Sequence, residues 1–399
     1  MQNWMNTLTY RRLAIINTHP IQYYSPLYRE LANREAVDIR VFYGWRGLSE
    51  EGYDPGFEQN VSWDVPLLDG YNYTFVENTA SDPGTHHFRG IVAPDLIPTV
   101  EDWAPDALLV FGWNYQAHLR ALRHFHGRVP VLFRGDSTLL DESPGPRKWL
   151  RRLSLRWVYR YVDGALYVGE NNRDYFEAHG FGDDDLAWVP HAVDNERFAN
   201  AEGTEEKASQ WRRKLGISEE APVVLFAGKL GSKKAPDVLV DAFLGMKDER
   251  AHLAIAGSGP MEDKLKKRAG GDPHVHFLGF QNQSRMPVVY RLGDVFVLPS
   301  RGPGETWGLA VNEAMACGRP VVVSSNVGCA PDLVNEDNGA VVPPEDTMAL
   351  REALESLLSD PEERRRMGER SADRIHDWSI EEAASRTAEA VNTAVSAAP

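Results

Sequence analysis

Short uninterrupted apolar runs, separated by stretches of loop or helix length, recur along the whole chain. In the first half we expect strands at 12–18, 37–44, around Tyr73, and at 106–111, 129–134, 164–168 and 186–190. In the second half we expect strands at 223–227, 252–256, 275–278, 295–298 and 320–324, with helices beginning near Pro236, Met261, Met286 and Gly308. Runs of Val, Leu and Ile without polar alternation are typical of strands buried on both faces of a parallel sheet. The pattern predicts an α/β chain with two doubly wound, Rossmann-like domains facing across a cleft.

The polar stretch at 194–220 interrupts this alternation and predicts a domain boundary. A chain of 399 residues is long for a single core, which also favours two domains. We therefore expect an N-terminal domain over 1–195 and a C-terminal domain over 196–378. Residues 45–93 are rich in Gly, Pro, Asp and aromatic residues and are expected to form long loops.

The charge balance and the cysteines narrow the class of protein. The chain carries 43 Lys and Arg against 58 Asp and Glu, a formal net charge of −15. This charge disfavours general nucleic-acid binding, which needs clustered cations. The two cysteines, Cys317 and Cys329, are expected to be reduced, because a chain of this size needs no disulfide. The sequence shows neither an apolar run of signal-peptide length at its start nor a membrane-span pattern, so we expect a cytoplasmic protein.

Three loops after predicted strands of the second half carry candidate chemistry. They contain GKLGSKK at 228–234, GSGP at 257–260 and LPSRGPGETWGL at 298–309. In open parallel sheets, ligands bind beyond the carboxyl ends of the strands, where such loops meet. Lysines can offset phosphate charge there, and the free N–H groups of Gly308 and Leu309 at a helix start can hold anionic oxygen. Taken singly, these features are more commonly a solvated basic loop, a tight turn and a carboxylate favoured by the helix dipole.

Glu305 and Glu313 form an E-x7-E pattern inside GETWGLAVNEAMACGRPVV, which resembles the signature of family 4 glycosyltransferases with the GT-B fold. Four further segments resemble that family in the same order: VPHAVDNERF at 189–198, GKLGSKKAPD, GSGP, and HDWSIEEA at 376–383. The resemblance covers the whole second half strongly and the first half weakly. It implies an acceptor-side N-terminal domain, a nucleotide-sugar-binding C-terminal domain, and a helix over 379–399 that crosses back to the N-terminal domain.

The resemblance also assigns expected roles at the donor site. Lys229 and Lys234 would contact the donor diphosphate, with Lys229 standing where the family usually has Arg, and Ala235 replaces the usual Gly. Glu313 would bind the ribose and Glu305 the transferred sugar. Arg285 matches a position that touches the base in some relatives, although a surface salt bridge is an equal alternative. The remaining expected donor contacts are Gly257, Thr306, Trp307, Gly308 and Leu309.

The first half departs from the family pattern. THPIQY at 18–23 replaces a glycine-rich loop, and FGWNYQ at 111–116 stands where many relatives carry a histidine. His19 is the candidate for a catalytic-site contact from this domain, beside Glu305, Lys234 and Lys229 from the other. Acceptor-side candidates are Asn114, His118, Arg134 and Asp136. Structural roles remain open for these N-terminal candidates.

The resemblance implies transfer of a hexosyl or related sugar with retention of anomeric configuration. No metal or cofactor is expected, and the donor would be a nucleotide-diphosphate sugar of UDP or GDP type. Asp183, Asp184 and Asp185 are accordingly interpreted as a solvated turn. The acceptor would be a carbohydrate, a lipid-linked molecule or a small molecule, in surface polysaccharide or glycoconjugate synthesis. Alternatives are a GT-B sugar phosphorylase, a nucleotide-sugar epimerase and a non-catalytic sugar-binding protein. A missing G-x-G-x-x-G after the first strand disfavours an NAD-linked dehydrogenase.

The segment 147–161, RKWLRRLSLRWVYRY, holds six basic residues and no acidic one. Trp149, Leu153 and Trp157 recur in it at helical spacing. Such a helix could lie on the inner face of an anionic membrane as a peripheral contact. We favour the alternative, an ordinary domain helix whose apolar stripe packs on the sheet.

Overall fold

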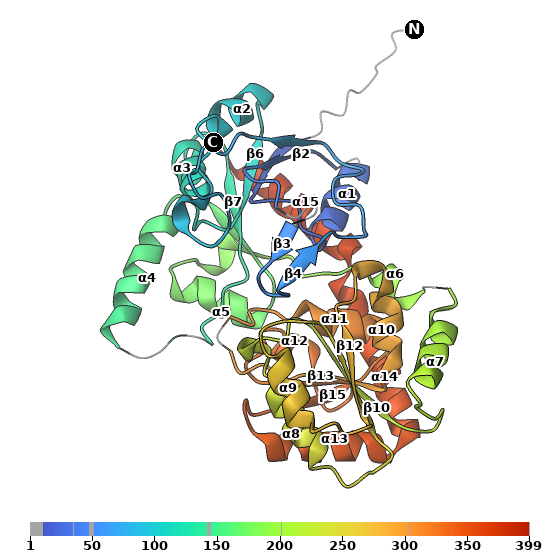
Figure 1. Ribbon diagram of the computed structural model, residues 1–399. Coiled ribbons are helices and arrows are strands. Elements are labelled where there is room, and N and C mark those ends of the chain that lie inside the picture. Colours follow the sequence, from blue (N-terminus) through green and yellow to red (C-terminus); the bar gives the residue numbers. More distant parts are fainter. Residues whose placement is uncertain are drawn as a thin grey trace.

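The computed structural model describes residues 11–34, 36–47, 52–140, 142, 145–200, 202–302 and 304–398. Two parallel sheets lie one above the other (Figure 1), in the doubly wound arrangement that the apolar runs predict. The first has the order β5-β2-β1-β6-β7-β8-β9, with β1 (Arg11–Asn17), β2 (Val37–Tyr43), β5 (Tyr73–Phe75), β6 (Ala107–Phe111), β7 (Val131–Arg134), β8 (Gly164–Tyr167) and β9 (Leu186–Trp188). The second has the order β12-β11-β10-β13-β14-β15, with β10 (Val223–Ala227), β11 (His252–Ala256), β12 (Val275–Gly279), β13 (Val295–Leu298), β14 (Val321–Ser324) and β15 (Gly339–Val342).

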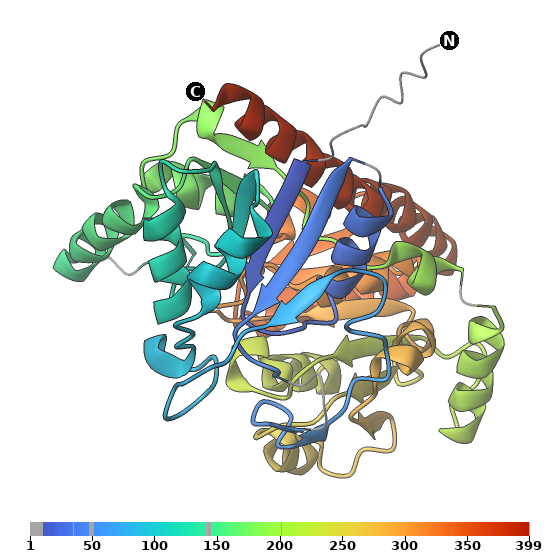
Figure 2. The ribbon, with the colours of Figure 1, turned by 90° about the horizontal axis from the view of Figure 1, so that it is seen from above.

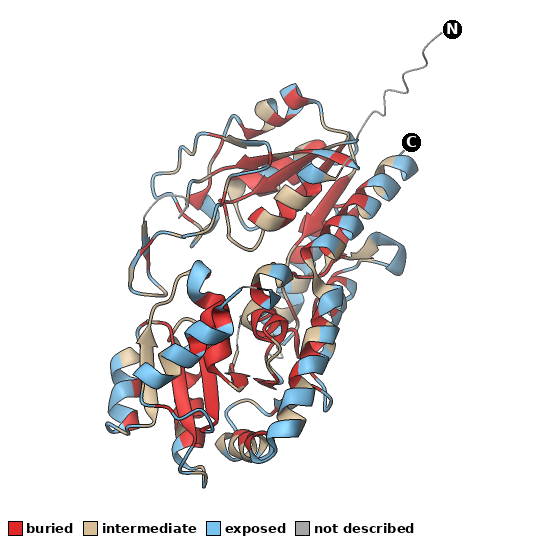
Figure 3. Ribbon diagram, turned by 90° about the vertical axis from the view of Figure 1, so that its right-hand side faces the viewer, coloured by how far each residue is buried: buried red, intermediate tan, exposed pale blue. Residues whose placement is uncertain are grey.

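Helices cover both faces of each sheet, and the central strands β6, β10, β11, β13 and β14 are buried along their whole length (Figure 3). Those of the first half are α1 (Ser25–Asn33), α2 (Leu96–Trp103), α3 (Gln116–Phe125), α4 (Pro146–Tyr159) and α5 (Glu170–Ala178). Those of the second half are α6 (Asn195–Ala199), α7 (Thr204–Lys214), α8 (Pro236–Leu244), α9 (Glu262–Ala269), α10 (Met286–Leu292), α11 (Leu309–Ala316), α12 (Ala330–Leu333), α13 (Thr347–Ser359), α14 (Pro361–Ile375) and α15 (Ile380–Ala397). Among the described residues, no helix has both the length and the apolar character needed to cross a membrane.

The last helix, α15, packs against the first sheet, although it follows the second sheet in the chain. Its apolar residues share a core with Leu13 and Ile15 of β1 and with the inner face of α1: Ile380, Ala383, Ala384, Ala388 and Val391. Figure 2 shows this helix, in dark red, lying along the blue strands of the N-terminal domain. Alanines let the helix approach closely, because a methyl group holds neighbouring backbones apart less than a longer side chain does.

Two expectations of local structure are corrected by the fold. Residues 52–61, expected as loop, form the antiparallel hairpin of β3 (Gly52–Asp54) and β4 (Gln59–Val61). The apolar stripe of α4, expected to pack on the sheet, is exposed instead at Trp149, Leu153 and Trp157. The residues of α4 that do pack inward are Leu155, Val158 and Tyr159.

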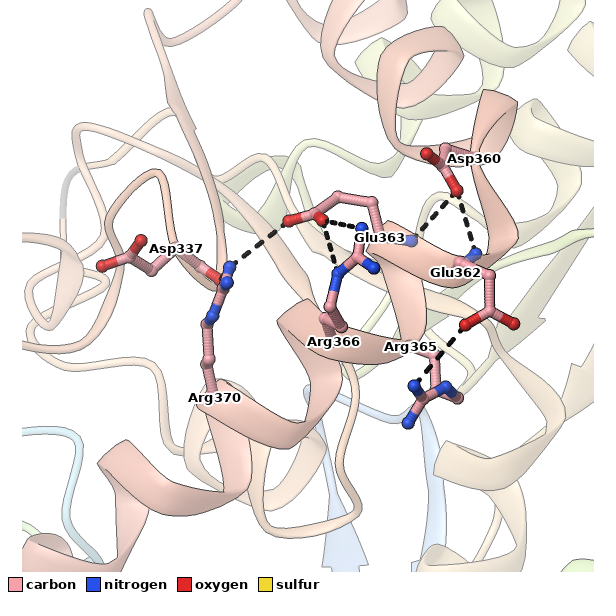
Figure 4. Close-up of polar contacts among 7 residues, drawn as sticks. All are labelled: Asp337, Asp360, Glu362, Glu363, Arg365, Arg366 and Arg370. Atoms are coloured by element: carbon pink, nitrogen blue, oxygen red, sulfur yellow. Dashed lines mark hydrogen bonds and ion pairs between the residues drawn. The ribbon is translucent and has the colours of Figure 1, made fainter.

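The first turn of α14 is closed by a side-chain cap (Figure 4). Asp360 accepts hydrogen bonds from the backbone N–H groups of Glu362 and Glu363, each at 3.0 Å. Arg366 pairs with Glu363 on the exposed surface nearby, at 2.6 Å. A cap of this kind satisfies helix-start donors that no intrahelical acceptor can reach.

Asp360→Ala is expected to lower the free energy of unfolding by about 1 kcal/mol, because both N–H groups lose their acceptor. Urea unfolding of the full chain measures this. Arg366→Ala serves as the matched control and should leave stability essentially unchanged, since an exposed ion pair contributes little. An equal loss in both variants would show that surface charge, and not the cap, stabilises this helix.

Candidate functional site

A cavity of about 440 Å³ lies between the two domains, at the carboxyl ends of their strands. In the second sheet the chain runs outward from β10 to β12 and then returns to β13, so β10 and β13 flank the point where the strand order reverses. Loops diverge at such a point and leave a crevice that side chains can line. Lys229 and Lys234 follow β10, and Glu305 follows β13. In the first sheet, His19 follows β1 at the equivalent reversal.

Lys234 and Glu305 form a buried ion pair at the floor of this cavity. The Nζ atom of Lys234 donates to both carboxylate oxygens of Glu305, at 3.1 and 3.0 Å, and Ser300 Oγ donates to the same carboxylate at 3.2 Å. Burial alone raises the pKa of Glu305, but the nearby charges of Lys234 and Lys233 and the hydrogen bonds outweigh it, so the pKa is lowered. Glu305 is therefore a carboxylate at neutral pH, fixed in orientation by its cation.

Glu313 lies deeper, on a helix that is buried almost all round. Tyr290 Oη donates to Glu313 Oε2 at 2.6 Å. The other oxygen, Oε1, is buried and has no hydrogen-bond partner among the described residues. Burial raises the pKa of Glu313 to about 7, while Tyr290, Arg197 and Lys234 oppose the rise. An unsatisfied buried acceptor is costly, and its position in the cavity wall makes it available to a hydroxyl donor from a ligand.

Glycines shape the walls around these charges. Gly257, at φ 135°, passes so close to the loop after β10 that a Cβ atom there would lie 1.9 Å from the carbonyl oxygen of Gly228. Gly308, at φ 100°, is the N-cap residue of α11, and Leu309 is the first residue of the helix. Both residues line the cavity. N–H groups of a first helical turn have no intrahelical acceptor, so this edge of the cavity favours anionic oxygen.

Thr306 and Trp307 lie in the cavity wall but also tie the two domains together. Thr306 Oγ1 donates to Asp136 Oδ2 of the first domain at 2.7 Å. Trp307 Nε1 donates to Asn312 at 2.9 Å, and Asn312 in turn donates to the carbonyl oxygen of His191 at 2.9 Å. Asp136 and Thr306 are thus brought to the cavity, where each already has a partner across the domain boundary.

The β3–β4 hairpin reaches from the first domain over the donor-side loops, which the sequence analysis did not foresee. Asp54 accepts two hydrogen bonds from Lys229 Nζ, at 2.9 and 3.0 Å. The Lys229 ammonium group also lies 4.8 Å from the ring centre of Phe57, whose carbonyl oxygen accepts from Ser258 at 2.9 Å. Lys229 therefore lies at the cavity, as expected. Its ammonium group is paired with the Asp54 carboxylate of the opposite domain, and a diphosphate would compete with that carboxylate for it.

His19 is the N-terminal candidate that lines the cavity together with Asp136. Burial lowers the pKa of His19 to about 4, so the ring is neutral at pH 7, and Nδ1 lies 2.9 Å from the Thr18 hydroxyl. His191, which sequence reasoning did not single out, also lines the cavity, and burial lowers its pKa to about 4. The sequence feature that could have identified His191 as a site residue is its position in the VPHAVDNERF segment.

Three other N-terminal candidates do not line the cavity. His118 is buried in the first domain, with Nδ1 at 2.9 Å from the Gly112 carbonyl oxygen. Arg134 is buried too, and donates to the carbonyl oxygens of Val189 and Pro190 at 3.0 Å each. Asn114 is exposed. The structural alternative thus accounts for His118 and Arg134.

Arg285 also does not line the cavity, and none of its described contacts is an ion pair. Its guanidinium group stacks over the Trp211 ring at 4.7 Å, a cation–π contact on the surface of the second domain. Its neighbour Gln283 is the buried residue that lines the cavity there, held by Arg197 through bonds of 2.7 and 3.2 Å. The single 3-10 turn at 283–285 places Gln283 inward and leaves Arg285 exposed.

Asp82, His86 and His87 form the one group in the described chain with metal-ligand spacing, and none of them lines the cavity. The Arg89 N–H donates to His87 Nδ1 at 3.2 Å, which leaves Nε2 of a neutral ring carrying the proton. Asp183, Asp184 and Asp185 form an exposed turn, as expected, with Asp183 paired to Arg173 at 2.8 Å.

Part of the chain is similar in sequence to known glycosyltransferases. A family model described as "Glycosyl transferases group 1" matches residues 207–374. The GDP-mannose-dependent monoacylated alpha-(1-6)-phosphatidylinositol monomannoside mannosyltransferase of Corynebacterium glutamicum is 33% identical over 249 residues, which are 60% of this chain and 63% of the relative. Alpha-D-kanosaminyltransferase of Streptomyces kanamyceticus is 32% identical over 183 residues, 45% of this chain and 46% of the relative. The chain spans less than two thirds of the length of either relative.

The fold is shared with solved structures over nearly the whole chain. HepE of Anabaena, solved in complex with UDP and glucose, has a TM-score of 0.72 at 17% identity, covering 96% of this chain and all of that one. A glycosyltransferase of Rickettsia africae has a TM-score of 0.74 at 14% identity, covering 98% of this chain and all of that one. At such low identity the likeness shows the fold, which is GT-B as the sequence resemblance implied.

Proposed function

We propose that the chain is a retaining glycosyltransferase that moves a sugar from a nucleotide-diphosphate donor to an acceptor hydroxyl, without a metal. The observation that carries the proposal is the pairing of two buried carboxylates with different surroundings in one cavity. Glu305 is ionised and held by Lys234, whereas Glu313 has an unpartnered oxygen deeper in the wall. The sequence relatives named as glycosyltransferases, and the neighbour solved with UDP and glucose, support this chemistry.

In the proposed complex, the diphosphate lies between Lys234, Lys229 and the first turn of α11. Lys229 exchanges its Asp54 partner for phosphate oxygen, and Glu313 Oε1 accepts a hydrogen bond from a ribose hydroxyl. Glu305 then faces the sugar. The bond between the anomeric carbon and the donor phosphate oxygen breaks while the acceptor oxygen attacks from the same face. The acceptor proton passes to the departing diphosphate, whose growing charge the lysines and helix-start amides stabilise.

The donor is proposed to be of UDP or GDP type, and the acceptor a carbohydrate, lipid-linked or small molecule in surface polysaccharide or glycoconjugate synthesis. UDP is the nucleotide bound in the HepE structure, and GDP-mannose is named for the Corynebacterium relative. We place the reaction in the cytoplasm, since Cys317 and Cys329 are buried free thiols of the kind that reducing compartments maintain.

Lys234→Ala is expected to weaken UDP or GDP binding by roughly ten- to a hundredfold while leaving uridine or guanosine binding unchanged, because its proposed partner is phosphate. Calorimetry with nucleotide and nucleoside measures both. Lys234→Gln is measured beside it, because its amide group, although uncharged, can still donate a hydrogen bond to the buried Glu305 carboxylate. Lys266→Ala, which removes an exposed lysine of α9 outside the cavity, should change nothing. Failure of the unaltered protein to bind either diphosphate would overturn the proposed function.

A further inference from the structure

Helix α4 has apolar residues on two opposite faces, and the protein covers only one of them. Leu155, Val158 and Tyr159 face the core of the first domain. On the other side, four large apolar side chains are exposed: Trp149 by 68%, Leu150 by 68%, Leu153 by 62% and Trp157 by 43%. At 3.6 residues per turn these four lie within an arc of about 100°. Figures 1 and 2 show α4 on the outer flank of the N-terminal domain, projecting from the body.

Cationic side chains border this outer face on both sides. By helical position, Arg156 lies just outside one edge of this arc and Arg147 outside the other, Arg160 falls within the arc, and Arg151 lies beyond Arg147; all four are exposed. None of them forms an ion pair with a residue that the structure describes. The other two basic residues, Lys148 and Arg152, share one carboxylate, that of Glu142, at 2.9 and 2.8 Å. Arginines without an ion pair, Arg147 and Arg156, thus flank an exposed Trp- and Leu-rich stripe.

The charge of this surface is opposite to that of the rest of the molecule. The chain has a net charge of −15, yet residues 145–162 contain six basic residues and no acidic one. A partner matched to the helix must therefore be anionic and must also accept apolar side chains. A symmetric contact with a second copy would place arginines opposite arginines, which disfavours that occupant.

We propose that α4 docks the protein on the surface of an anionic lipid bilayer. The helix lies in the plane of the interface, with Trp149, Leu153 and Trp157 among the upper acyl chains and the flanking arginines at lipid phosphates. Tryptophan suits the boundary between headgroups and hydrocarbon, and arginine gains attraction to anionic lipid. The 14-residue helix is about 21 Å long, enough for an interfacial anchor and too short to span.

Docking would also orient the cavity. The segment from β7 to α4 carries Asp136, which lines the cavity, ten positions before Pro146 at the helix start. A bilayer under α4 would thus be linked to the cavity wall by a short stretch of chain. The docking proposal itself concerns lipid binding alone and does not depend on the proposed transferase activity.

Co-sedimentation of the full chain with vesicles tests the proposal. We expect binding to vesicles of phosphatidylcholine mixed with phosphatidylglycerol, weak binding to phosphatidylcholine alone, and weakening as NaCl is raised. Leu153→Glu should reduce partitioning roughly tenfold or more, because it removes an inserted side chain and adds a repelled charge. Met348→Glu is the matched control, since Met348 is 61% exposed on α13 of the other domain and the charge change is identical. It should bind as the unaltered protein does.

A paired arginine experiment separates charge at this helix from charge in general. Arg147→Gln with Arg156→Gln should also cost roughly tenfold or more, whereas Arg365→Gln with Arg366→Gln on α14 should not. Thermal unfolding checks that each variant is folded. Equal losses in test and control variants, or no binding to anionic vesicles, would overturn the proposal. So would a dimer in sedimentation velocity that Leu153→Glu dissociates, because the face would then be a protein interface.

Discussion

Glu305→Gln is expected to lower kcat by roughly 10²–10³-fold while leaving the affinity for a bare nucleotide diphosphate intact or slightly tighter. The carboxylate is oriented by Lys234 and Ser300 toward the part of the cavity proposed for the sugar, so its charge acts on the reacting centre. Glutamine keeps the size of the side chain but removes the charge. It also removes an anion that competes with phosphate for Lys234, which is why binding should not weaken.

Glu313→Gln is the counterpart in the same experiment. Its free oxygen is proposed to bind the ribose, so this variant should chiefly weaken nucleotide binding and affect turnover at saturating donor less. Calorimetry with UDP and GDP and steady-state kinetics with the full donor compare the two variants. Loss of nucleotide affinity in the Glu305 variant with normal binding in the Glu313 variant would reverse the assignment of the two carboxylates.

The second large effect expected is on the pH dependence of stability. Burial raises the pKa of Glu313 from 4.5 to about 7. Between these values the folded protein binds more protons than the unfolded chain, so this group's contribution to stability falls as pH rises through pH 4.5–7 and is constant above. The pKa difference corresponds to about 3 kcal/mol. The free energy of unfolding of Glu313→Gln, relative to the unaltered protein, should therefore rise by about that amount between pH 4.5 and pH 8.

Urea unfolding of both proteins across this range measures the effect. The comparison uses the difference in unfolding free energy between the two proteins. His19, His118 and His191 have lowered pKa values, which make stability rise with pH. Their contribution is the same in both proteins and cancels in the difference. Glu352→Gln, at an exposed position of α13, is the control and should run parallel to the unaltered protein. A parallel curve for Glu313→Gln would show that the carboxyl is not protonated in the folded state at pH 6.

Elements that are buried on both faces were the ones that the sequence predicted best. The strands β10, β11 and β13 match the runs at 223–227, 252–256 and 295–298 to the residue, since burial keeps every position except His252 apolar. The hairpin β3–β4 has three-residue strands with exposed positions, so it leaves no periodic signal. β15 was missed for a related reason, because it has only four residues and its two middle positions are not buried.

The donor side of the site was predictable because its residues follow strands directly. Lys229, Lys234 and Glu305 needed only the rule that loops at one end of a parallel sheet converge. Partners supplied by the other domain were not predictable: Asp54 lies 175 positions before Lys229 in the chain. The direction of each side chain could not be predicted either. Arg134 and Asp136 are two positions apart, yet Arg134 points into the domain and Asp136 reaches the cavity.

The packing of α15 has a consequence for how the chain is made. The first sheet is complete in sequence at Trp188, but the helix that covers Leu13 and Ile15 begins at Ile380. At about 5–20 residues per second, a ribosome needs roughly 10–40 s to add the residues between them. During that interval one apolar face of the N-terminal domain stays open to the cell, while the C-terminal sheet can close on its own core. The domain translated first is thus the one finished last, and chaperone binding during synthesis should concentrate on its uncovered face.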